Sequence, residues 1–225
     1  MGARNARSPS LAIIGFVCVI TFAVAGAHAA QTVHGDVAAW NEIHAAFKKL
    51  WALSAYRANV TSSYASTVIE IVRPGSYHSV SRETIGTSVQ TNEFIYVNGQ
   101  IRKRTIGAPG VPAEWQCSND RARSPQSGPS RFDPFDLTAS NGTLDVSRGP
   151  DTVIDGTPVR TYQYIVTQSD TQSGQTMRTK DTIYVGKASG LPRRIVNASA
   201  SGNVDGITDF YDYDANIVIT LPPCK

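Results

Sequence analysis

The sequence predicts an α+β fold: a curled, mostly antiparallel sheet, an unclosed half-barrel, with an N-terminal amphipathic helix packed on its concave face. Two observations predict it. Residues 35–56 have a strong helical periodicity of apolar residues. From residue 56 to the C-terminus the periodic segments are strand-like, and no helical segments alternate with them. Many sequential strands favour an antiparallel sheet, and a large twisted sheet curls. The apolar side of the helix needs an apolar surface, which the concave face supplies.

Residues 1–30 have the three parts of a secretory signal peptide. Arg4 and Arg7 supply the positive region, residues 11–26 form an apolar run, and small residues follow. The alternative is an uncleaved membrane anchor, but the run is shorter than the ~20 apolar residues of a spanning helix. We expect cleavage near Ala29/Ala30, a single domain over residues 31–225, and a soluble protein that is periplasmic or secreted.

The charge of the chain argues against a nucleic-acid partner. Removal of residues 1–30 takes away two arginines and no acidic residue, so the formal charge falls from +3 to +1. Nucleic-acid binding requires a basic patch that neutralises phosphates, and a near-neutral chain does not favour one. We therefore expect no nucleic-acid partner.

Two cysteines remain after the signal peptide, Cys117 and Cys224. An even number of cysteines in an exported chain indicates a disulfide. A redox-active or metal-binding thiol pair is the alternative, but such pairs usually have a C-x-x-C spacing or neighbouring histidines, and neither is present. We expect a structural Cys117–Cys224 bridge that joins the C-terminus to the middle of the chain.

The helical segment begins after Asp36, whose carboxylate can accept hydrogen bonds from the free backbone N–H groups of the first turn. Apolar and aromatic residues then recur at steps of three and four, which makes one apolar face. This face consists of Val37, Trp40, Ile43, His44, Phe47, Leu50 and Trp51. Two tryptophans and a phenylalanine give it a large aromatic surface.

Strand patterns follow in two blocks. In the first, Asn98-Gly99 predicts a tight hairpin turn, which places Tyr96 opposite Ile101 and Phe94 on the same side. In the second, Asp155-Gly156 predicts another tight turn. The later sequence "GKASGLPRRI" (186–195) predicts a further turn, in which Gly190 can adopt a positive φ.

Residues 107–150 separate the two blocks and are dense in proline, glycine and serine. So long an irregular segment is uncommon in a compact domain and is usually functional when it occurs. We interpret residues 107–150 as a long insertion and as the candidate contact surface for a protein partner in the cell envelope.

The order of these parts resembles the LolA/LppX-like superfamily of exported lipid- and lipoprotein-carrying proteins. The resemblance covers nearly all of the chain after the signal peptide. It rests on five stretches: "WNEIHAAFKKLWALSAYRANV", "IYVNGQIRKR" followed by "EW", "DGTPVRTYQYIV", "DTIYVGKASGLPRRI" and "DGITDFYDYDANIVITLPP". The resemblance implies an unclosed β-barrel with an apolar cavity for acyl chains, and no catalytic residues. The serine- and threonine-rich strands, the cysteine pair and the 107–150 insertion depart from the superfamily pattern.

Catalytic and metal sites find little support in the sequence. No nucleophile elbow, zinc-binding H-E-x-x-H or phosphate-binding glycine loop occurs. The aspartates of residues 205–214 lack the spacing of a calcium loop, and we interpret them as solvated charges. We expect no enzyme activity, no metal and no cofactor.

The candidate ligand contacts are aromatic residues of the helix and of two strands: Trp40, Phe47, Trp51, Phe94, Tyr96, Tyr162 and Tyr164. The alternative is that they simply form the core. Together with the resemblance to the LolA/LppX-like superfamily, these residues lead us to expect a monomeric carrier that binds a lipid or an acylated lipoprotein, with transient contact to a membrane. The alternative function is a structural or protein-interaction component of the envelope with a filled core.

Overall fold

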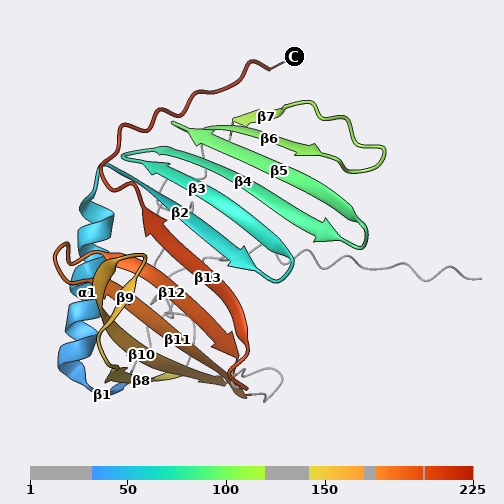
Figure 1. The fold of residues 1–225 in the computed structure, drawn as a ribbon. Helices are drawn as coiled ribbons and strands as arrows, with labels where there is room; N and C mark the ends of the chain where they lie inside the picture. Colours follow the sequence, from blue (N-terminus) through green and yellow to red (C-terminus); the bar gives the residue numbers. More distant parts are fainter. Residues whose placement is uncertain (1–31, 120–141, 170–175, 200, 225) are drawn as a thin grey trace, which may run out of the picture.

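A computed structural model describes residues 32–119, 142–169, 176–199 and 201–224 of the 225-residue chain (Figure 1). The signal peptide expected over residues 1–30, with its cleavage site, lies outside the described residues. The described part contains a single helix, α1 (Val37–Ala52), and thirteen strands. The strands are β1 (Thr32–Gly35), β2 (Ala55–Ser62), β3 (Ala65–Val72), β4 (Ser76–Ile85), β5 (Ser88–Val97), β6 (Gln100–Ile106), β7 (Gln116–Asn119), β8 (Gly142–Arg148), β9 (Thr152–Ile154), β10 (Thr157–Ser169), β11 (Thr176–Gly186), β12 (Pro192–Ser199) and β13 (Val204–Tyr211).

All thirteen strands belong to one curled, unclosed sheet, which confirms the predicted fold class (Figure 1). The strand order is β1-β8-β10-β11-β12-β13-β2-β3-β4-β5-β6-β7, and β9 pairs with β10. Among the described strands, β1 and β8 form the one parallel pair. The early and late parts of the chain meet where β13 pairs with β2, so this junction joins two halves of the sheet.

The predicted turns are confirmed. Asn98 and Gly99 have φ values of 49° and 86°, and Tyr96 pairs with Ile101 across the hairpin. Asp155 and Gly156 turn in the same way, with φ values of 48° and 75°. Gly190 has a φ of 65°, a conformation that favours glycine because it has no Cβ.

Two features were not predicted. A short strand, β1, precedes the helix and pairs with β8, and four residues are too few to show a strand period. The segment 107–150 also contains β7 and β8, which lie toward opposite ends of the strand order. Residues 120–141, between these two strands, lie outside the described residues.

Helix α1 packs on the concave face of the sheet against β8, β11 and β12. Asp36 caps it as predicted, because its Oδ1 accepts a hydrogen bond of 2.9 Å from the Ala39 amide. Its buried side chains are Ala39, Ile43, Ala46, Phe47 and Leu50. Val37 and His44 were expected on the apolar face but are exposed. Successive residues are about 100° apart around a helix. Val37 and His44 are therefore each roughly a third of a turn away from the buried Ile43, which directs their side chains away from the sheet.

The predicted disulfide between Cys117 and Cys224 is present, with the two Cα atoms 6.1 Å apart. It joins the C-terminal segment to β7. Arg102 Nε supports the same attachment by donating a 3.2 Å hydrogen bond to the Pro222 carbonyl. The bridge closes a loop over a sequence separation of 107, and such a loop contributes roughly 5 kcal/mol in the chain-entropy model.

Candidate ligand-binding face

One row of large side chains crosses the concave face from β2 to β6. Strand pairing places its members opposite one another in succession: Tyr56, Ile71, Tyr77, Tyr96 and Ile101. We call these five residues the aromatic row. Tyr56 and Ile71 belong to the same hydrophobic core as the buried side of α1. The other members share their side of the sheet because strand pairs keep directly opposed residues on one face.

Aromatic contacts connect the row to the helix. Phe47 of α1 meets Phe210 of β13 edge to face, with ring centroids 6.2 Å apart. Phe210 in turn lies 6.4 Å from Tyr56. At the other side, Tyr77 meets Phe94 at 5.9 Å. Such pairs contribute roughly 0.5–1.5 kcal/mol each beyond the area they bury, so these rings stabilise both ends of the row.

Burial decreases along this surface from α1 toward β5. Tyr56 and Ile71 are 0% and 2% exposed, whereas Tyr77, Phe94 and Tyr96 are only half-buried. The reason lies in the position of α1, which packs over β8, β11 and β12. In the described ranges no second helix covers β4–β6. Among the described elements, α1 covers the aromatic side chains of this part of the face incompletely.

The structure separates the seven predicted contact residues into two groups. Phe94 and Tyr96 lie on β5, in the half of the sheet away from α1. The other five lie in the half of the molecule that contains the helix: Trp40, Phe47 and Trp51 on α1, and Tyr162 and Tyr164 on β10. Of these, Phe47, Tyr162 and Tyr164 are at most 1% exposed, so they form a filled core. The two tryptophans are half-buried at the edge of that core.

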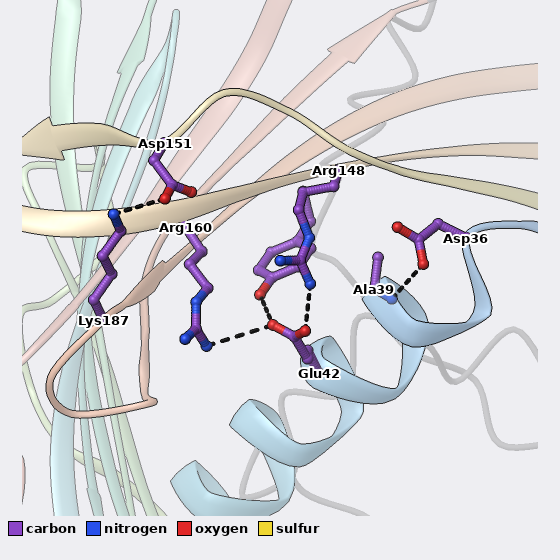
Figure 2. A network of polar contacts seen from close by, with 8 residues as sticks. Asp36, Ala39, Glu42, Arg148, Asp151, Arg160 and Lys187 are labelled. Atoms are coloured by element: carbon purple, nitrogen blue, oxygen red, sulfur yellow. Dashed lines mark hydrogen bonds and ion pairs between the residues drawn. The ribbon is translucent and has the colours of Figure 1, made fainter.

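A polar cluster around Glu42 links α1 to strands β8 and β10 of the sheet (Figure 2). The Glu42 carboxylate accepts hydrogen bonds from the Tyr162 hydroxyl and from Arg148, and it lies 3.5 Å from Arg160 Nη1. The hydrogen bond from Tyr162, together with Arg148, holds the pKa of Glu42 below its usual value. Burial and the Glu42 carboxylate raise the pKa of Tyr162 to about 12. The contact is therefore between a charged carboxylate and a neutral phenol at physiological pH.

Two further polar contacts hold the same region. Lys49 Nζ donates to the Ser189 carbonyl, which attaches the last turn of α1 to the 187–190 turn. Under the helix, Asp181 is 7% exposed and accepts a 2.9 Å hydrogen bond from Asn197. Burial raises the pKa of Asp181, although hydrogen bonds from Tyr164 and Asn197 oppose the shift. The Lys49 contact holds α1, and the Asp181–Asn197 bond joins β11 to β12.

Tyr56 and Tyr77 are members of the face that the sequence reasoning missed. The stretch "SYHSVS" around Tyr77 alternates only weakly, and Tyr56 lies at the transition from helix to strand. The signal that could have found them is the alternation of side chains along each strand. It assigns them to the face of Tyr96 only when the β2–β3, β3–β4 and β4–β5 pairings are known.

The described residues show no cluster of three or more His, Cys, Asp or Glu side chains that could hold a metal ion. The aspartates near the C-terminus are engaged elsewhere. Asp212 pairs with Arg57 at 2.7 Å, and Asp214 Oδ1 accepts from the Ser54 amide and hydroxyl. None of the described helices has the length and apolar character needed to cross a membrane.

An unclosed antiparallel half-barrel with a helix on its concave face defines the LolA/LppX-like fold, and this chain has that fold. It is similar to LprF from Mycobacterium bovis, with a TM-score of 0.56 and 13% identity over 84% of this chain and 98% of that chain. It is also similar to the Mycobacterium tuberculosis lipoprotein LppX, with a TM-score of 0.56 and 12% identity over 83% of this chain and all of that chain. At these identities the similarity shows the fold alone. No family model and no curated protein sequence matches the chain.

Proposed function

We propose that the protein is an exported, non-enzymatic carrier that binds a hydrophobic or amphiphilic ligand, such as a lipid or the acyl chains of a lipoprotein. One observation carries the proposal: the half-buried aromatic surface of Tyr77, Phe94 and Tyr96, which α1 leaves incompletely covered. Ligand sites are mostly apolar and concave. The LolA/LppX-like fold supports the same function through the resemblance to lipid- and lipoprotein-carrying proteins.

The location follows from the proposed signal peptide at residues 1–30, which directs a single domain, residues 31–225, to the periplasm or the cell exterior. The disulfide supports this location, because disulfides persist in oxidising compartments. Transfer of a lipid implies transient membrane contact. The 107–150 insertion remains the proposed surface for an envelope protein partner.

Direct ligand contact is proposed for the half-buried members of the predicted set: Trp40, Trp51, Phe94 and Tyr96. The fully buried Phe47, Tyr162 and Tyr164 support the sheet and the helix from within the core. A ligand over β5 gains by covering apolar area at about 25 cal/mol per Å². It does so without displacing α1, which Glu42 and Lys49 hold in place.

The test is a titration of the delipidated protein with N-phenylnaphthylamine, a neutral probe whose fluorescence rises in apolar sites. Phe94→Ser should weaken binding about tenfold, because it removes apolar contact area from the concave face. The matched control is Val80→Ser on the neighbouring strand β4. Val80 lies opposite Glu93, one residue before Phe94, and therefore on the other face of the sheet. Absence of probe binding, or equal losses in both variants, would overturn the proposal.

The alternative function is a structural or interaction component of the envelope, and one observation favours it. The core beneath α1 is filled, with Phe47 and Tyr162 both 0% exposed. This alternative predicts that the wild-type protein binds no apolar probe while it retains a folded, cooperative unfolding transition.

A further inference from the structure

The concave face contains a buried hydroxyl without a hydrogen-bond partner. Tyr56 is 0% exposed, and its hydroxyl oxygen bonds to no group in the described residues. A buried polar group left unsatisfied costs roughly 1–3 kcal/mol, and such groups in native proteins require an explanation. Two other buried core tyrosines are bonded: Tyr162 to Glu42 and Tyr164 to Asp181. Tyr56 therefore differs from its neighbours in the same core.

A cation lies beside Tyr56 at the end of the aromatic row. The Arg73 amide donates a 2.8 Å hydrogen bond to the Ser54 carbonyl, which continues the β2–β3 ladder two residues beyond the Tyr56–Ile71 pair. By strand alternation Arg73 falls on the side of Ile71, the concave side. Burial raises the pKa of Tyr56, and the Arg73 guanidinium opposes that rise. Arg73 is half-buried, so it remains within reach of a molecule on this face.

Two aspartates near this end of the face, Asp212 and Asp214, are held by other groups. Asp214 Oδ1 accepts from both the amide and the hydroxyl of Ser54, at 2.8 and 2.9 Å. Asp212 pairs with Arg57, which lies on the opposite face because it alternates with Tyr56 along β2. The concave side at this end carries two hydrogen-bond donors, the buried Tyr56 hydroxyl and the half-buried Arg73 guanidinium. A donor pair of this kind is complementary to an anionic acceptor such as a carboxylate or a phosphate.

We propose that the ligand is an anionic amphiphile, whose headgroup binds Arg73 and the Tyr56 hydroxyl while its acyl chain lies along the aromatic row toward Tyr96 and Phe94. This inference rests on the proposed carrier function and adds the polarity and direction of the ligand. The headgroup supplies the acceptor that Tyr56 otherwise lacks. The half-buried Tyr77, next to Ile71 in the row, lies between headgroup and chain.

The experiment displaces N-phenylnaphthylamine with three ligands of equal chain length: dodecanoate, dodecyl phosphate and dodecanol. The wild-type protein should bind at least one anion about tenfold more tightly than the alcohol, because hydrogen bonds to charged groups contribute about 1.5–3 kcal/mol. Preference for dodecanoate alone identifies a carboxylate, and preference for dodecyl phosphate alone identifies a phosphate. Arg73→Gln and Tyr56→Phe should remove the preference and leave dodecanol binding unchanged.

Matched controls are Arg82→Gln, on the outer face of β4, and Tyr211→Phe, on the outer face of β13, which alternate with Ser81 and Phe210. Tyr56→Phe should also leave the urea midpoint unchanged or raise it, because it removes an unsatisfied hydroxyl. Equal affinity for all three ligands would overturn the inference, as would equal losses in the control variants. Failure of the neutral probe itself to bind would instead overturn the carrier function.

Discussion

The structure predicts that two phenylalanines of the same face differ in what they contribute: one mainly to stability and the other mainly to ligand affinity. Phe47 of α1 is fully buried against Phe210, whereas Phe94 of β5 is half-buried next to Tyr77. Phe47→Ala should lower the free energy of unfolding by about 3–5 kcal/mol, the usual range for a phenylalanine removed from a filled core. Phe94→Ala should lower it by only about 1–2 kcal/mol, because that side chain is only partly buried and its removal leaves no enclosed cavity.

The assay is equilibrium urea unfolding followed by far-ultraviolet circular dichroism, with probe titration of each folded variant. Phe47→Ala should keep most of its probe affinity when measured well below its unfolding midpoint, because the ligand lies beyond the helix. Phe94→Ala should lose affinity while staying folded. A loss of stability below about 2 kcal/mol for Phe47→Ala, or a larger loss for Phe94→Ala, would refute the assignment of core and ligand surface.

Two further predictions concern pH and the disulfide. Burial raises the pKa of Tyr56 and of Tyr213 to about 12, from the ordinary value of 10.0. The native state then retains protons that the unfolded chain loses, so stability should be complete below pH 10 and fall between about pH 10 and 12. A spectrophotometric tyrosine titration with parallel urea curves tests this; unchanged stability up to pH 12 would contradict it. Replacing both Cys117 and Cys224 by serine should lower the free energy of unfolding by about 2–4 kcal/mol. A loss below about 1 kcal/mol would show that the C-terminal segment is held independently of the bridge.

Local patterns in the sequence were sufficient for much of the fold. The Asp36 cap, the Asn98-Gly99 hairpin and the tight turn at Gly156 each depend on neighbouring residues, and each was predicted. The Cys117–Cys224 bridge followed from the number of cysteines and the expected compartment. Element order and turn chemistry together were enough for the fold class.

The division of the candidate site could not be predicted in the same way. Whether Tyr162 is covered by α1 and Tyr96 is not depends on where β13 pairs with β2, a contact between residues 206–211 and 57–62. Hydrophobic periodicity gives the face of each strand but not its neighbours in the sheet. The parallel pairing of β1 with β8 is non-local in the same sense.

The central claim is that the ligand lies on the concave face over β3–β6, beside a fixed helix. Methyl NMR with a doxyl-labelled stearate tests it most directly, because the nitroxide broadens nearby methyl signals. Ile69 and Ile101 lie on the concave face and should broaden, whereas the exposed Val153 of β9 and Val68 on the opposite face of β3 should not. Equal broadening of all four residues, or broadening confined to Val68 and Val153, would contradict the claim.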